Sequence, residues 1–104
     1  MYATEPTRYF IEWESLELYN ELERQAKEDG SYSPDHDDWY DPVDIQESLD
    51  IADVDSMRVD AREIAVTESL FAQVRIFERI GIHRNEYGYW NYREIDEVET
   101  VYAP

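Results

Sequence analysis

The first regular pattern along the chain is an alternation of side-chain types over residues 8–13. Aromatic and β-branched side chains occupy every second position, at Tyr9, Ile11 and Trp13. Successive residues of a strand point to opposite faces, and these residue types favour sheets. The alternation therefore predicts a β-strand near the N-terminus.

The next segment has a helical period. Ser15 is a favourable N-cap, and Gly30 suits a helix C-terminus because glycine tolerates a left-handed backbone. At 100° per residue the apolar face comprises Leu18, Tyr19, Leu22 and Ala26. The opposite face is a carboxylate stripe of Glu14, Glu17, Glu21 and Glu28. We predict a helix from Ser15 to about Asp29 with one acidic side.

Residues 31–41 have the composition of a turn or loop, and a second helix is expected after them. Asp41 followed by Pro42 is a typical helix start, so we predict a short helix from Pro42 to about Ala52. Its buried residues would be Ile45, Leu49 and Ala52, and its exposed acids Asp44, Glu47 and Asp50. A brief extended stretch is expected where apolar and polar residues alternate, at Met57, Val59 and Ala61.

A third helix is predicted from a capping box at Asp60 to Ile80, with Gly81 as its C-cap. Its apolar residues make it the best core candidate: Ile64, Val66, Leu70, Phe71, Val74 and Phe77. Residues 87–102 are rich in Tyr, Trp, Ile and Val and predict one or two strands. The pattern predicts an α+β fold, a small antiparallel sheet packed with two or three helices in a single compact domain over 1–104.

Composition changes the picture because the chain is strongly acidic. Its 104 residues include 26 Asp and Glu against nine Lys and Arg, for a net charge of -17. This charge excludes the basic surface of an ordinary nucleic-acid binder, while 42% hydrophobic content is enough for a core. The absence of Cys excludes disulfides, thiolate zinc sites and thiol nucleophiles.

The negative charge is concentrated in the middle of the chain. Residues 31–60 hold ten acids and one base, and the span from Asp35 to Asp55 holds nine carboxylates and no Lys or Arg. Apolar residues are interspersed among these acids: Trp39, Tyr40, Val43, Ile45, Leu49 and Ile51. A disordered acidic tail needs no such apolar residues. We interpret 31–56 as an acidic loop and short helix held on a folded body.

Catalytic and metal-binding signatures are weak. The run Asp35-His36-Asp37-Asp38 offers oxygen and imidazole ligands, but its residues are adjacent and lack the spacing of a calcium loop. No nucleophile elbow or phosphate-binding glycine loop is present. We expect no catalytic residue, no metal and no cofactor.

Targeting signals are also lacking. The chain has no apolar run of about 18 residues and no basic segment followed by an apolar one at its start. We therefore expect a cytoplasmic protein, and anionic lipid would repel its surface.

In size, charge and aromatic content the whole chain resembles the acidic DNA-mimic inhibitors of phages and mobile elements, the antirestriction and anti-CRISPR class. The resemblance implies a non-enzymatic inhibitor that blocks the DNA-binding groove of a host defence nuclease or CRISPR surveillance complex in the host cytoplasm. Its partner would be a basic DNA-binding protein or nucleoprotein complex, without direct binding to nucleic acid. The expected partner-binding residues are Asp35, Asp37, Asp38, Trp39, Tyr40, Asp41, Asp44, Glu47, Asp50, Asp53, Asp55, Glu14, Glu17, Glu21 and Glu28.

Two other interpretations stay open. One is an acidic interaction or regulatory module that binds a basic protein without imitating DNA. The other is a salt-adapted small domain, since the chain has one Lys against eight Arg. A homodimer also stays open, because exposed Tyr and Trp would favour self-association while the net charge opposes it.

Overall fold

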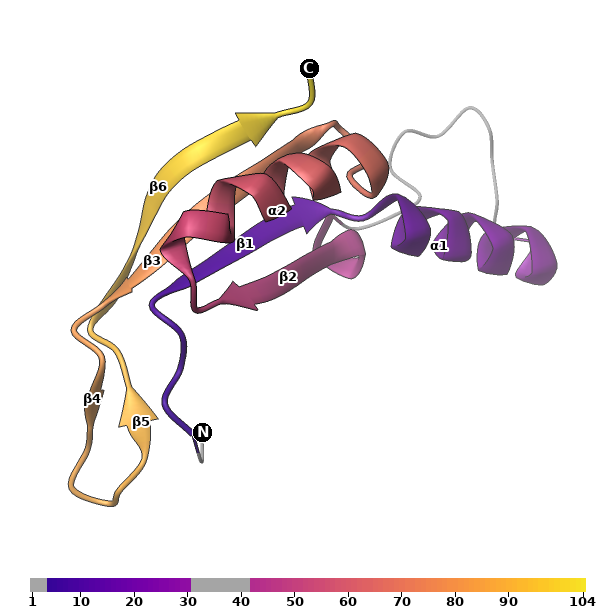
Figure 1. The fold of residues 1–104 in the computed structure, drawn as a ribbon. Coiled ribbons are helices and arrows are strands. Elements are labelled where there is room, and N and C mark those ends of the chain that lie inside the picture. The colour runs from indigo at the N-terminus through magenta and orange to yellow at the C-terminus, as the bar shows by residue number, and fades with distance from the viewer. Residues whose placement is uncertain (1–3, 31–41) are drawn as a thin grey trace.

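A four-stranded antiparallel sheet forms the centre of the computed structural model, which describes residues 4–30 and 42–104 (Figure 1). The sheet has the order β2-β1-β3-β6, and a separate two-stranded ribbon pairs β4 with β5. The strands are β1 (Tyr9–Glu14), β2 (Gln46–Ile51), β3 (Gln73–Ile80), β4 (His83–Arg84), β5 (Trp90–Asn91) and β6 (Glu94–Tyr102). With two α-helices, this arrangement confirms the predicted α+β class.

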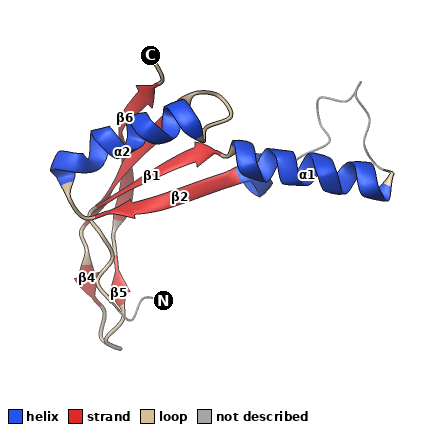
Figure 2. Ribbon diagram, turned by 45° about the vertical axis from the view of Figure 1, so that its right-hand side comes forward, coloured by secondary structure: helices blue, strands red, loops and turns tan. Residues whose placement is uncertain are grey.

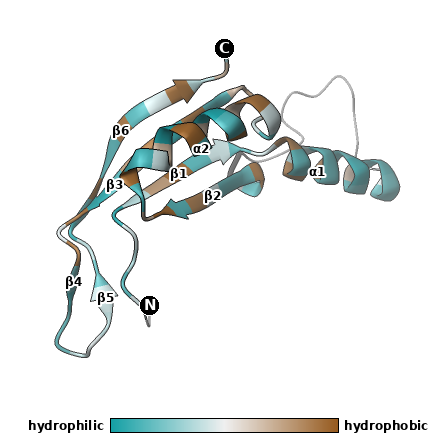
Figure 3. Ribbon diagram, in the orientation of Figure 1, coloured by the Kyte–Doolittle hydropathy of each residue, from teal (hydrophilic) through white to brown (hydrophobic). Residues whose placement is uncertain are grey.

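Helix α2 (Val54–Thr67) lies across one face of the sheet, and the core is between them (Figures 1 and 2). The alternation of β1 turns every second side chain toward this helix, and β3 does the same. The core consists of Ile11, Trp13, Ile51, Met57, Ala61, Ile64, Ala65, Val74 and Ile76. Figure 3 shows apolar residues recurring along α2, whereas α1 is hydrophilic along most of its length.

The other face of the sheet is held by an aromatic and guanidinium stack. The rings of Phe10 and Phe77 stack at 5.1 Å, and the Arg79 guanidinium lies 4.5 Å from the centre of the Phe10 ring. Arg79 is only 9% exposed, and its Nη2 donates to Asp50 Oδ1 at 2.8 Å. Its Nη1 donates to the carbonyl oxygen and hydroxyl of Thr7. These contacts join β1, β2, β3 and the N-terminal segment.

Helix α1 (Leu16–Asp29) confirms the predicted helix and its two ends. The Ser15 hydroxyl accepts a hydrogen bond from the Leu18 N–H, and Gly30 ends the helix at φ +80°. The helix projects away from the sheet (Figure 2), and Ala26 is its one buried residue. Because α1 and the β4–β5 ribbon extend from the sheet at opposite ends, the molecule measures 49 × 36 × 18 Å.

The predicted helix over 42–52 is wrong. A short 3₁₀ helix, η1 (Pro42–Ile45), leads directly into the edge strand β2. Strand β2 pairs with β1 along its whole length, from Glu14 opposite Gln46 to Tyr9 opposite Ile51. This pairing outweighs the local helix signal at Asp41-Pro42. Burial of Ile45 is confirmed, but Leu49 is 44% exposed.

The predicted third helix is also wrong in both of its limits. Helix α2 starts seven residues earlier, because Asp53 is its N-cap and accepts from the Asp55 N–H at 2.9 Å. The expected extended stretch at 57–61 is therefore helical, and the helix ends at Thr67. Residues 73–80 form the strand β3, which pairs with β1 on one side and β6 on the other. Of the predicted core residues, Val66 and Phe71 are exposed.

The predicted strands near the C-terminus are confirmed as β5 and β6. Gly81, at φ +74°, redirects the chain from β3 into the β4–β5 ribbon. A turn at Asn85 closes this ribbon, because the Asn85 side-chain oxygen accepts from the N–H groups of Tyr87 and Tyr89. The ribbon presents Tyr87 and Tyr89 to solvent.

Candidate interaction site at the acidic end

A carboxylate-lined groove lies where the start of α1, strand β2 and the end of α2 meet. Its volume is about 540 Å³. Its charged lining consists of Glu17, Glu21, Arg24, Glu47 and Glu68. The backbone fixes this junction, because the N–H of Leu16 donates to the carbonyl of Glu68 and the N–H of Ser15 to that of Ile45. We call this hollow the α1 groove.

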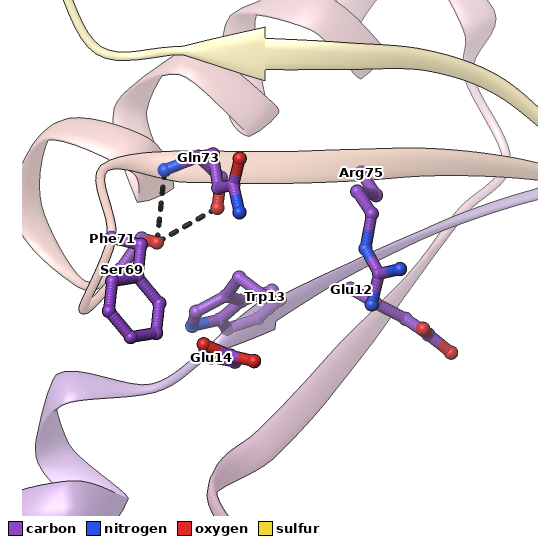
Figure 4. A pocket seen from close by; sticks show the side chains of 7 residues that line it. All are labelled: Glu12, Trp13, Glu14, Ser69, Phe71, Gln73 and Arg75. Atoms are coloured by element: carbon purple, nitrogen blue, oxygen red, sulfur yellow. Dashed lines mark hydrogen bonds between the residues drawn. The ribbon is translucent and has the colours of Figure 1, made fainter. Parts of the chain in front are cut away.

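A smaller pocket, of about 190 Å³, lies between the end of β1 and the start of β3 (Figure 4). The ladder between these strands ends at the pair Glu12 and Arg75, and the strands separate beyond it. The hydroxyl of Ser69 donates to the Gln73 carbonyl and accepts from the Gln73 N–H, which stabilises the separation. We call this hollow the β1–β3 pocket, lined by Glu12, Trp13, Glu14, Ser69, Phe71, Gln73 and Arg75.

Both hollows carry excess negative charge. Together they are lined by six carboxylates and by two guanidinium groups, those of Arg24 and Arg75. A third hollow, beside the N-terminal segment, balances Glu5 and Glu78 against Arg8 and Arg79. A fourth, between α2 and β6, has two arginines and one glutamate. The two hollows with an excess of carboxylates therefore lie at one end of the sheet, which we call the acidic end: Glu12, Glu14, Glu17, Glu21, Glu47 and Glu68.

The structure brings together residues from both acidic segments of the sequence. Glu17 and Glu21 come from α1, and Glu47 comes from β2, yet all three line the α1 groove. Glu14 was expected on the same helical stripe but lies at the end of β1, in the β1–β3 pocket. Sequence reasoning missed Glu12 and Glu68. Glu12 lies on the predicted strand over 8–13, and Glu14 follows two residues later, so the two share a face because the strand continues to Glu14.

The stripe on α1 contains its own counter-charge. Arg24 contacts Glu21 through two nitrogens, and its Nη1 donates to Glu28 at 2.6 Å. This guanidinium lowers the pKa of Glu21 to about 2, and Gln25 adds a smaller effect in the same direction. The two carboxylates raise the pKa of Arg24. Glu21 and Glu28 are therefore partly neutralised, whereas no ion pair engages Glu17 within the described ranges.

The acids of β2 and of the α2 start do not form one face. Because β2 is a strand, Glu47 and Asp50 point to opposite sides of the sheet. Asp50 binds Arg79, and Asp53 caps α2, so both have structural partners. Asp44 is exposed on η1, and Asp55 lies in the first turn of α2. The expected side with Asp44, Glu47 and Asp50 in helical register is not formed.

Six predicted partner-binding residues lie outside the described residues: Asp35, Asp37, Asp38, Trp39, Tyr40 and Asp41. Within residues 4–30 and 42–104, no group of three or more His, Asp or Glu side chains is arranged to hold a metal ion. None of the helices in these ranges is long and apolar enough to cross a membrane. No family model, curated protein or solved structure matches the chain.

Proposed function

We propose that this protein is a non-enzymatic inhibitor that presents carboxylates where DNA presents phosphates. It would block the DNA-binding groove of a basic partner, such as a host defence nuclease or a CRISPR surveillance complex. The observation that supports this function best is the acidic end, where carboxylates from α1, β1, β2 and the α2 terminus gather around two hollows. A groove built from Lys and Arg for phosphates would be attracted to such a surface.

The charge per length of the molecule supports the same proposal. Four acids, Asp35, Asp37, Asp38 and Asp41, lie outside the described ranges, so the other 22 acids and the nine bases give a net charge of -13. The longest dimension is 49 Å. Phosphates of one DNA strand are about 3.4 Å apart along the axis, so this length of one strand carries about 14 charges and of a duplex about 29. The protein therefore matches one strand of a duplex in linear charge.

Shape adds a second argument. Helix α1 stands out from the sheet, so its exposed acidic side is accessible to a concave partner (Figure 2). Glu17 and Glu47 face the α1 groove at the base of this helix. A partner that binds here would exchange its counterions for fixed carboxylates, as it does when it binds DNA.

Displacement of DNA tests this function. A labelled duplex is bound to each member of a panel of restriction nucleases and CRISPR surveillance complexes, and its fluorescence anisotropy is measured as the full chain is added. We expect the chain to release DNA from at least one member. The release should weaken by about 10-fold or more as salt rises from about 50 to about 200 mM.

A matched pair of double variants distinguishes the contribution of the acidic end to displacement from the contribution of the net charge of the chain. Glu17→Lys with Glu47→Lys should lose at least about 10-fold in displacement, because it reverses two carboxylates of the α1 groove. Glu63→Lys with Glu86→Lys makes the same change of net charge at exposed positions on α2 and the ribbon, and should lose far less. Equal losses in both variants, or displacement from no member, would contradict the proposal.

The β4–β5 ribbon favours a second candidate, an acidic module that binds a basic protein without imitating DNA. Tyr87 is 76% exposed and Tyr89 is 40% exposed, and such tyrosines are typical of protein interfaces. A partner that binds the chain and DNA at the same time, and whose binding depends on Tyr87 and Tyr89, would identify this function instead.

A further inference from the structure

The β1–β3 pocket contains a buried hydrogen-bond donor. Trp13 is 7% exposed, and its indole Nε1 has no hydrogen-bond partner among residues 4–30 and 42–104. Figure 4 shows the ring inside the pocket, with its nitrogen turned toward the side formed by Phe71 and Glu14. Buried polar groups in folded proteins are nearly always hydrogen-bonded, so this donor marks the position for an acceptor atom of a ligand.

Of the charged side chains that line the pocket, Glu12 and Arg75 have interaction partners and Glu14 has no ion pair within the described residues. Glu12 accepts from the Gln46 side chain at 3.2 Å and stands opposite Arg75 in the β1–β3 register. The Arg75 guanidinium lies 5.6 Å from the centre of the Phe77 ring. The Glu14 carboxylate, in contrast, has no ion-pair partner in the described part of the chain. The side of the pocket near Trp13 Nε1 is therefore the side that favours a cation.

An aromatic ring completes this side. Phe71 is 53% exposed although it lines the pocket, so one part of its ring is accessible to a ligand. A cation above the face of an aromatic ring is attracted by the ring quadrupole, and a planar guanidinium also stacks on it. The volume of about 190 Å³ is smaller than the about 300–1,000 Å³ of pockets that take drug-sized ligands, and it suits one side chain.

We propose that the β1–β3 pocket binds a single arginine residue of the basic partner. The guanidinium lies between the Glu14 carboxylate and the Phe71 ring, and a backbone carbonyl oxygen of the bound segment accepts from Trp13 Nε1–H. This inference rests on the proposed function, because it takes the partner to be basic. It adds an anchor that a purely electrostatic surface lacks, since a carboxylate beside an aromatic ring selects a planar guanidinium over other cations.

The pocket is tested with N-acetyl-L-arginine amide and the ¹⁵N-labelled full chain. The readout is the indole N–H resonance of Trp13 in a ¹H–¹⁵N spectrum, and the Trp90 indole serves as an internal reference. We expect a saturable shift of the Trp13 resonance with a Kd on the order of 1 mM, as for other ligands of this size. N-acetyl-L-citrulline amide, which has nearly the same shape without the charge, should bind at least about 10-fold more weakly.

A third ligand identifies the source of the arginine. Free L-arginine carries an α-ammonium that Glu12 and Glu14 attract and an α-carboxylate that they repel, so it gains no net charge over the amide. Its two backbone charges cost more to remove from water than the two amide groups, so it should bind more weakly than the amide. Tighter binding of free L-arginine would mean that the pocket takes the amino acid, and would overturn the anchor. A Trp13 shift that is absent, or equal for arginine and citrulline amides, would overturn the pocket itself.

Variants distinguish a loss of ligand binding in the β1–β3 pocket from a loss of folding. Trp13→Phe should abolish the response, but Trp13 belongs to the core, so the decisive variant is Glu14→Gln. It keeps the shape of the side chain and should weaken binding of the arginine amide by at least about 5-fold, whereas Glu63→Gln on exposed α2 should not change it. This titration involves no DNA, so it can fail while DNA displacement succeeds, and the reverse also holds.

Discussion

At the scale of single residues, Arg24 places one positive charge within the acidic side of α1, and that side stays negative overall. It stands three residues after Glu21 and four before Glu28, so all three side chains lie on one side of α1. Glu21 and Glu28 hold the guanidinium, and the three groups keep one net negative charge. The pairing orders side chains that otherwise repel each other.

Titration of Glu21 tests this pairing. The pKa of Glu21 in the folded chain is about 2, below its value of about 4.3 in an unfolded chain. A lowered carboxyl pKa contributes stability that is present above pH about 4.3 and is lost as pH falls toward 2. The ¹³C resonance of the Glu21 carboxyl should therefore have its midpoint near 2 in the native chain. In Arg24→Gln the midpoint should move up toward the unfolded value.

The matched control for this titration is Lys27→Gln. Lys27 is a cation of the same helix and pairs with Glu23 at 3.1 Å. Its removal should leave the Glu21 midpoint near 2, because the side-chain hydrogen bond from Arg24 is the largest cause of the shift and Lys27 is not among the causes. A midpoint that rises equally in both variants would show that the general charge of α1 sets the pKa of Glu21, and the pairing would then be unimportant.

Residue identities predicted part of the acidic end. Glu14, Glu17, Glu21 and Glu47 were expected to bind a partner, and all four line its two hollows. Their division between two hollows was not predictable, because it depends on where β1 ends and on which strand β2 pairs with. The Arg24 pairs were readable from spacing alone, since residues three and four apart are neighbours on a helix.

At the scale of elements, the segments whose structure is set by neighbouring residues were predicted correctly, and two strands that depend on pairing with distant strands were not. Strand β1 and helix α1 were predicted because the alternation, the Ser15 cap and Gly30 are all local. Strands β2 and β3 were taken for helices because their apolar residues also fit a helical period, and pairing with distant strands decided their structure. The predicted α+β class is still correct, because the structure contains an antiparallel sheet and two α-helices despite these two wrong assignments.

Gly81 is the element boundary whose role can be measured most directly. At φ +74° it joins β3 to the ribbon, and a Cβ there would stand 2.9 Å from the Arg93 Cβ. Gly81→Ala should destabilise the fold by about 2–3 kcal/mol, from a left-handed alanine together with the steric contact. Gly30→Ala has a similar φ of +80°, but a Cβ there would meet no atom of the described residues within 4 Å, and the substitution should cost about 1 kcal/mol. Chemical denaturation gives both free energies, and equal losses would show that Arg93 yields without cost.

At the scale of the whole molecule, the charge and the core are arranged independently. The core between α2 and the sheet is apolar, while the acids lie outside it, on α1, β2, β6 and the outer side of α2. Carboxylates on β2 also protect an edge strand from pairing with other chains. Folding therefore does not require the acidity, and gathering like charges carries a cost in self-repulsion.

That cost predicts how the stability of the whole chain responds to salt. With a net charge of -17, self-repulsion should destabilise the fold most at low ionic strength. Raising NaCl from about 20 to about 500 mM shortens the Debye length to a few ångströms, and should raise Tm by about 4–8 °C, equivalent to about 1 kcal/mol. The exposed ion pairs oppose this trend, but each contributes little.

Calorimetry in NaCl and in equal ionic strengths of another neutral salt measures the effect. A fall in Tm would show that ion pairs outweigh repulsion, and a chain that is folded only near molar salt would be a salt-adapted domain instead.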